Sequence, residues 1–191
     1  MRKTGLYSRN RGKRGERLWC SFCREQGYDV HRTAQYRGNT GAAGDVEGLP
    51  YIHCEVKYVQ ALNIAKAMEQ SVRDSMAGEE HDDPILHDIP IVASKRSKEP
   101  WLVTMEFLDW VVMSETGNFN HKKIYTVGKK QEKFSIRKAI EEAKGRFQQG
   151  DIFAISYHRG DFNLATMYAE DWFTIYREWE AGMDLKRRQE S

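Results

Sequence analysis

Two acids and a lysine that could act together on a phosphate lie within one short stretch of the chain, at Asp45, Glu55 and Lys57. A hard divalent cation such as Mg²⁺ or Mn²⁺ prefers oxygen ligands, so the two carboxylates and the Val56 carbonyl could hold one beside a phosphate. The Lys57 ammonium could then stabilise the charge that develops on the attacked phosphate, or orient an attacking water. These residue types therefore predict metal-dependent phosphoryl chemistry.

The spacing of these residues predicts a hairpin of two short strands around a turn at Gly48-Leu49-Pro50. In the second strand alternate residues share a face, which places His53, Glu55 and Lys57 together. With the turn at the centre of the hairpin, we expect Asp45 to lie opposite His53 and diagonal to Glu55, at roughly 7–8 Å between α-carbons. A shift of one residue would turn Asp45 to the opposite face.

The pattern Asp45…Glu55-Val56-Lys57 resembles the PD-(D/E)XK nuclease superfamily, with Gly44 in the place of the proline in that name. Upstream, a helix that opens at Gly15-Glu16-Arg17 and ends at Gly27 is followed by a strand and a glycine-rich loop. This order is similar to that of the archaeal-type Holliday junction resolvases and their phage relatives. The resemblance covers about residues 10–112.

The resemblance implies a restriction-endonuclease-like α/β core over residues 16–115, with a mixed central sheet flanked by helices. It implies that Glu16 completes a metal site with Asp45 and Glu55, and that Lys57 is catalytic. The activity it implies is a Mg²⁺- or Mn²⁺-dependent endonuclease of DNA recombination, which acts on branched or junction DNA as a homodimer. Two alternatives stay open: a restriction or repair endonuclease that acts on duplex DNA, and a DNA-binding protein that keeps the fold without cutting.

A second helix is predicted to begin after Asn63, which can cap it, and to pack through a narrow stripe that includes Ile64, Met68 and Ser71. Gln70 lies beside that stripe. In several nuclease families a glutamine on this helix faces the metal site, so Gln70 is a candidate for the active site. The alternative for Gln70 is a solvated helix flank.

Basic residues that could contact DNA phosphates are grouped in three places. Residues 1–15 are predicted to form a flexible arm, for which a solubilising tail is the alternative. A strand at Tyr28–Ala34 leads into a glycine-rich loop that could also be a plain connector. A basic turn follows a strand at Ile89–Ala93. The candidate DNA contacts are Arg9, Arg11, Lys13, Arg14, Arg32, Arg37, Lys95 and Arg96.

The composition is that of a soluble globular protein, with 191 residues, 40% hydrophobic residues and a formal net charge of +2. No apolar run long enough to span a membrane occurs, so we expect a cytoplasmic protein without membrane contact. Cys20 and Cys23 form a single Cys-x-x-Cys pair, and Cys54 is the third cysteine. Buried small side chains are favoured over a zinc site, because a zinc site would need a second pair of ligands.

Residues 122–182 resemble the preceding segment in pattern and are predicted to form a degenerate α/β repeat, packed on the core or in a dimer interface. The alternative is a chance alignment of helices and strands of similar composition. At an offset of 72 positions, Lys129 matches Lys57, whereas Val127 stands where Glu55 stands. The last predicted helix carries an aromatic stripe that includes Trp172 and Trp179, which core packing explains first and an interface second. Residues 183–191 are predicted to be a solvated tail.

Overall fold

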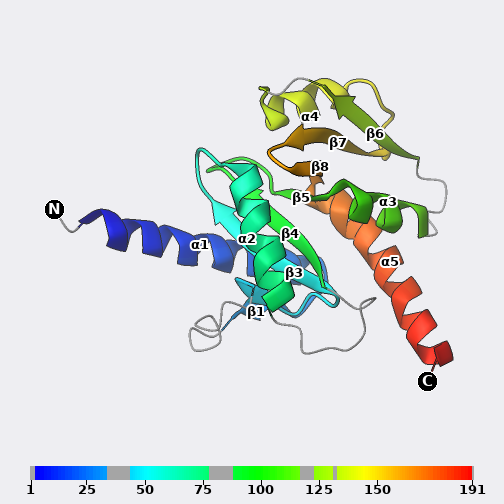
Figure 1. The fold of residues 1–191 in the computed structure, drawn as a ribbon, viewed down its shortest axis with the longest axis horizontal. Coiled ribbons are helices and arrows are strands. Elements are labelled where there is room, and N and C mark those ends of the chain that lie inside the picture. The colour runs from blue at the N-terminus through cyan, green and yellow to red at the C-terminus, as the bar shows by residue number, and fades with distance from the viewer. Residues whose placement is uncertain (1–2, 34–43, 78–87, 117–122, 131–132, 191) are drawn as a thin grey trace. The chain divides into compact units, whose positions relative to one another are not determined.

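The computed structural model describes residues 3–33, 44–77, 88–116, 123–130 and 133–190. It divides the chain into two compact units, unit 1 (Met1–Trp101) and unit 2 (Leu102–Ser191). Each unit contains helices together with parallel and antiparallel strand pairs (Figure 1). The protein is therefore an α/β protein with mixed strand pairing, as the sequence predicts.

Unit 1 is built on strands that are hydrogen-bonded in the order β1-β2-β3-β4. The strands are β1 (His31–Arg32), β2 (Val46–Glu47), β3 (Ile52–Tyr58) and β4 (Ile89–Lys95). β2 pairs antiparallel with both β1 and β3, while β3 and β4 run parallel. Residues 52–56 of β3 are all buried, as expected for a strand that is paired along both edges and covered on both faces.

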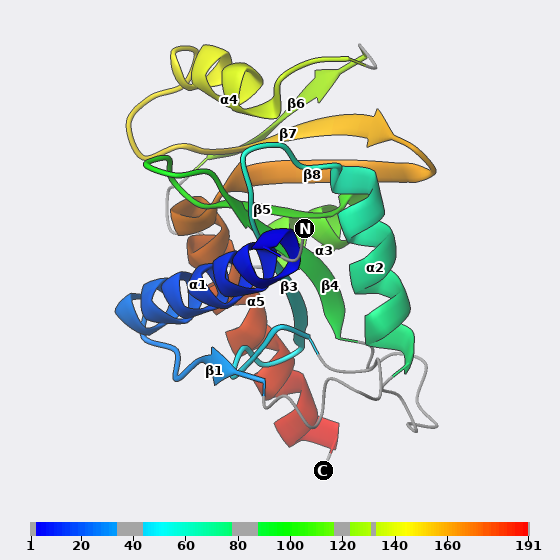
Figure 2. The same ribbon diagram turned by 90° about the vertical axis from the view of Figure 1, so that its left-hand side faces the viewer.

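Two helices flank these strands, α1 (Lys3–Glu25) and α2 (Ile64–Ala77). They pack against opposite faces of β3, because alternate residues of a strand point to opposite sides. Gly15 of α1 lies against Tyr58, whereas Gln70 of α2 bonds to the neighbouring Lys57. Figure 2 shows α1 lying across β3.

The start of α1 differs from the prediction. The helix begins at Lys3, so the expected start at Glu16 is wrong and residues 3–15 are helical. Glycines in this segment indicated a flexible arm, but a glycine inside a helix costs only about 1 kcal/mol relative to alanine. The guanidinium groups of Arg11 and Arg14 also lie over the Tyr58 ring, at 5.7 and 6.0 Å from its centroid, which holds this part of the helix on the strand.

β1 is shorter than the predicted strand at Tyr28–Ala34. The Val30 N–H donates to the Tyr28 carbonyl at 2.9 Å, and the Val30 carbonyl accepts from Arg24 Nη1 at 2.8 Å. The backbone groups of Val30 are therefore used locally, and strand pairing begins only at His31.

The start of α2 confirms the prediction. Asn63 Oδ1 accepts a hydrogen bond from the Lys66 N–H at 3.2 Å, which caps the first turn. The buried residues of the helix follow the predicted stripe, and Ser71 on it donates through Oγ to the Ile91 carbonyl of β4. These contacts fix which side of α2 faces the strands.

Unit 2 contains strands hydrogen-bonded in the order β5-β8-β7-β6. The strands are β5 (Leu102–Glu106), β6 (Ile124–Lys129), β7 (Ile152–Arg159) and β8 (Phe162–Tyr168), and the helices are α3 (Phe107–Thr116), α4 (Ile136–Lys144) and α5 (Ala169–Glu190). β8 pairs antiparallel with β5 and β7, and β7 runs parallel to β6. The predicted aromatic stripe of α5 is core: Trp172, Ile175, Tyr176 and Trp179 are all buried.

The elements follow one order twice, β3-α2-β4-β5-α3 and then β6-α4-β7-β8-α5. Ser135 caps α4 as Asn63 caps α2, 72 positions earlier. In unit 2, Thr104 of β5 lies opposite Thr166 of β8 in the antiparallel pair, and their hydroxyls are 2.8 Å apart. The boundary between the units falls before β5, so the last strand and helix of the first series cluster with the second series.

Within the described residues, no helix combines the length and the apolar character needed to cross a membrane. All three cysteines are buried and unoxidised. Burial raises the pKa of the Cys20, Cys23 and Cys54 thiols, which suits small core side chains better than thiolate ligands.

The close approach of α1 to β3 can be tested at two glycines of α1. A Cβ on Gly15 would lie 2.5 Å from the Tyr58 Cβ, so Gly15→Ala should lower the free energy of unfolding, by about 1–3 kcal/mol. A Cβ on Gly12 would meet only Glu16 Oε1, at 3.7 Å. Gly12→Ala is therefore the matched control and should leave stability unchanged or raise it by up to about 1 kcal/mol. Urea unfolding of both variants checks this, and equal effects would contradict the packing.

Candidate active site

The turn between β2 and β3 sets which residues face each other. Val46 pairs with Cys54, so the expected register, with Asp45 opposite His53, is wrong by two residues. Gly48 has a φ of 109°, and a Cβ there would lie 2.3 Å from the Asp29 carbonyl oxygen, which explains the glycine. A shift of two residues keeps each side chain on its face, and it moves Asp45 from beside His53 to beside Glu55.

The backbone before β2 lies directly on β3. The Asp45 N–H donates to the Cys54 carbonyl at 3.0 Å, and Asp45 Oδ2 accepts from the Val56 N–H at 2.7 Å. A Cβ on Gly44 would lie 2.9 Å from the Cys54 carbonyl oxygen. Glycine at position 44 thus permits the approach that fixes the Asp45 carboxylate.

The Asp45 carboxylate is in an unfavourable place for a negative charge. Burial raises the pKa of Asp45 to about 7, the Glu55 carboxylate adds to the rise, and the Val56 N–H opposes it. The charges of Glu16 and Lys57 also act on Asp45, the first raising and the second lowering its pKa. Glu16, Glu55 and Lys57 therefore all lie within electrostatic reach of Asp45.

Lys57 connects β3 to α2. Its Nζ is paired with Glu55 Oε1 and donates to Gln70 Oε1 at 3.1 Å. The Glu55 side chain is only 5% exposed, whereas that of Lys57 is 26% exposed, so the lysine forms the outer part of the pair. Gln70, predicted as a candidate for the site, thus lies in it and positions the Lys57 ammonium.

Glu16 reaches the site from α1. The close contact of Gly15 with Tyr58 brings this turn of the helix onto β3. Glu16 Oε2 forms an ion pair with Arg32 Nε of β1 at 2.5 Å, and the glutamate side chain is only 16% exposed. In this arrangement Arg32, expected to contact DNA phosphate, instead neutralises Glu16.

The other predicted DNA contacts are distributed around this centre. Arg11 and Arg14 lie over Tyr58, next to Lys57 on β3. Lys95 Nζ lies over the Trp101 ring, 5.6 Å from its centroid. Lys13 is half-buried and Arg96 is exposed. The Arg9 side chain and Arg37 lie outside the described part of the chain.

A pocket of about 380 Å³ opens beside Lys57. Its lining includes two basic residues that the sequence analysis missed, Lys66 and Arg73. Both are exposed residues of α2. They are spaced four and three residues from Gln70, so one face of a helix carries all three. That spacing was the signal: once Gln70 is placed at the site, its neighbours one turn away must lie near it.

The oxygen atoms of the site are potential metal ligands. Among the described residues, no three His, Cys, Asp or Glu side chains are grouped so that they could hold an ion as they stand. Lys57 is paired with Glu55, and Arg32 with Glu16. The chemistry nevertheless fits a hard cation, because the donors are carboxylate oxygens and a cation would offset the burial and the Glu55 charge that disfavour ionisation of Asp45. A bound ion would require the two basic side chains to turn away.

A comparison of the chain with protein-family models, curated proteins and solved structures found no match.

The raised pKa of Asp45 predicts a pH dependence of stability without metal. An unfolded aspartate ionises near its ordinary pKa of 3.8, whereas the folded Asp45 holds its proton up to about pH 7. The stability that the protonated form provides is therefore complete below the unfolded pKa and is lost as pH rises through the folded value. Asp45→Asn should remove this loss, so the variant should gain stability over the parent between about pH 4 and pH 7. Urea unfolding in EDTA across this range measures it, and parallel pH profiles would contradict the buried carboxylate.

Proposed function

We propose that the protein is a metal-dependent endodeoxyribonuclease that resembles the PD-(D/E)XK nucleases, closest in pattern to the Holliday junction resolvases. The observation that supports this most is the convergence of Asp45, Glu55 and Lys57 on the β2–β3 pair. Three elements besides this pair contribute: α1 brings Glu16, β1 brings Arg32 and α2 brings Gln70. The proposal is supported by the fact that side chains from separate parts of the chain lie near the β2–β3 pair.

Asp45 and Glu55 would hold Mg²⁺ or Mn²⁺, with Glu16 and the Val56 carbonyl as further ligands. When bound, such an ion lowers the pKa of a water and polarises the phosphate. Asp45 is kept in position by the Val56 N–H, and burial of Glu55 keeps its carboxylate from turning to solvent. Lys57 is hydrogen-bonded to Gln70, which would keep its ammonium beside the site if an ion took its place on Glu55, and the ammonium could then stabilise charge on the phosphate.

Positive charge beside the site supports a nucleic acid as the substrate. Lys57, Lys66 and Arg73 line one pocket, and Arg11 and Arg14 lie at the adjoining end of β3. Phosphate contacts of this kind orient a DNA backbone without reading its sequence. Branched or junction DNA is the substrate that the resemblance favours, with a homodimer in the cytoplasm as the working form.

The catalytic assignment predicts that Asp45→Asn and Lys57→Ala lose cleavage of a labelled four-way junction in Mg²⁺, by at least about 10²-fold. Junction binding measured in EDTA should stay within a few-fold of the parent. Lys138→Ala is the control, because Lys138 is an exposed lysine of α4 in unit 2. It should cut normally. Retained cutting by either unit 1 variant would remove the assignment.

The substrate assignment is tested separately by comparing the four-way junction with a linear duplex of the same sequence. A junction resolvase should cut the junction at least about tenfold faster at equal binding saturation. Equal rates would favour the restriction or repair alternative, and would leave the metal-dependent chemistry in place.

One observation favours a non-catalytic DNA-binding protein instead. Each of the two glutamates is already neutralised, Glu55 by Lys57 and Glu16 by Arg32, so the site is balanced in charge without an ion. A protein of this kind would bind the junction in EDTA and show no nicking in Mg²⁺ or Mn²⁺ at any pH.

A further inference from the structure

One face of β6 is open where the corresponding face of β3 is covered. Cys54 and Val56 of β3 are buried, in part by α1. The residues 72 positions later on β6, Thr126 and Gly128, are exposed. Trp110 of α3 reaches this face with a hydrogen bond from Nε1 to Thr126 Oγ1, at 3.0 Å. Beyond that contact, no described helix of unit 2 takes the place that α1 has in unit 1.

A pocket of about 300 Å³ lies on this open part of unit 2, a volume at the lower end for small-molecule sites. It forms where β6 and β7 end and β8 begins, beside the first residue of α3. Gly128 and Ser156 are partners in the parallel pair, and His158 and Asn163 are partners in the antiparallel pair. Its lining is Phe107, Gly128, Lys129, Lys130, Ser156, Tyr157, His158, Asn163 and Leu164.

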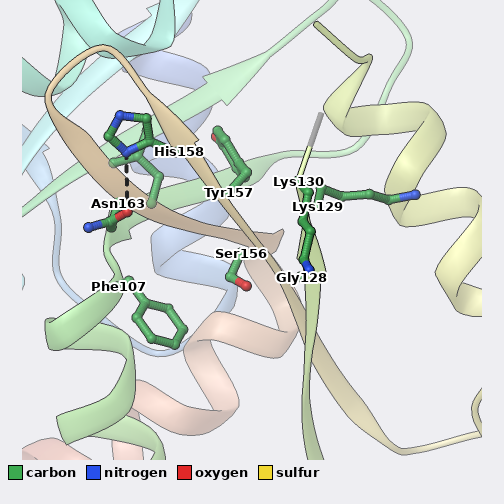
Figure 3. Close-up of a pocket in the computed structure, with 9 residues that line it drawn as sticks. Phe107, Gly128, Lys129, Lys130, Ser156, Tyr157, His158 and Asn163 are labelled. Carbon is green, nitrogen blue, oxygen red and sulfur yellow. Dashed lines mark hydrogen bonds between the residues drawn. The ribbon is translucent and has the colours of Figure 1, made fainter. Parts of the chain in front are cut away.

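Among the residues that the structure describes, the lining combines an aromatic ring with positive charge and includes no carboxylate. Figure 3 shows Phe107 on one side of the pocket and Lys129 and Lys130 on the other, with the hydrogen-bonded pair of His158 and Asn163 nearby. Lys129 Nζ forms an ion pair with Glu142 Oε2 at 3.4 Å, whereas Lys130 is exposed. Gly128 has only Ser156 Oγ near its missing Cβ, at 3.8 Å, so the strand backbone is accessible there.

We propose that this pocket holds one nucleotide of a single-stranded stretch of DNA, with the base against Phe107 and its phosphate on Lys130. An aromatic ring beside a cation is the arrangement that binds unpaired nucleotides, because every unstacked base offers a π-face and every phosphate a charge. Ser156 and Asn163 offer polar groups to the edge of the base. The choice of DNA rests on the proposed function. The pocket binds and does not cut, since no acid is found among the described residues that line it.

The test measures binding of a fluorescent oligothymidine to the full chain by anisotropy in EDTA, so that it does not depend on cleavage. Lys130→Glu should weaken binding about tenfold and flatten its salt dependence. Phe107→Leu keeps an apolar side chain but removes the ring, and should weaken binding several-fold at unchanged salt dependence. Lys123→Glu is the matched control, because it is an exposed lysine at the other end of β6. It should bind as the parent does.

Each result decides the assignment. If the parent does not bind the oligothymidine, the proposed nucleotide site is wrong. If Lys130→Glu and Lys123→Glu weaken binding equally, binding reflects the overall positive charge of the protein and the proposed site is also wrong. Parental affinity in Phe107→Leu would remove the base contact. Tighter binding of oligouridine with the same dependence on Phe107 would replace DNA by RNA. The parent protein could show no nuclease activity in any assay and still bind in EDTA in a manner that depends on Lys130. That result would contradict the proposed function and support this binding site.

Discussion

The arrangement in unit 1 depends on holding two carboxylates, those of Asp45 and Glu55, side by side in a largely buried place. Their mutual repulsion and the loss of water disfavour ionisation, as the pKa of Asp45 shows. The Val56 N–H and the Lys57 ammonium oppose this, and Arg32 does the same for Glu16. A fold keeps such a cluster only where surrounding contacts enforce it, and such clusters are more frequent at functional sites than elsewhere.

Sequence patterns predicted β3 and α2 well, because period two and a capping Asn63 are local signals. The face of Asp45 was also predictable, since the error in register was an even number of residues. The partner of Asp45 was not, because the turn extends to Tyr51, a non-glycine residue with a φ of 61°. The pairing of Arg32 with Glu16 depends on where α1 crosses β3, and no local pattern contains that information.

The length of α1 shows a second limit of sequence patterns. Three glycines and many arginines indicate a mobile segment when they are considered alone. One of these glycines, Gly15, instead allows the helix to pack closely on Tyr58 of the strand. Whether this segment is a mobile arm or a packed helix depends on tertiary contacts, which the local sequence does not contain. In α2, by contrast, the position of Gln70 makes Lys66 and Arg73 neighbours by helical geometry, so that part of the site was present in the sequence and overlooked.

The hydroxyl contact between Thr104 and Thr166 joins corresponding positions of the two series of elements, 62 residues apart. Two identical subunits that met in this way would carry every substitution twice, once in each half. A single polypeptide that contains both halves is released from that symmetry, because each half has its own codons. Val127 can then replace the acid in one half while Glu55 is kept in the other, and an altered half is free to acquire a role that an exact copy could not take.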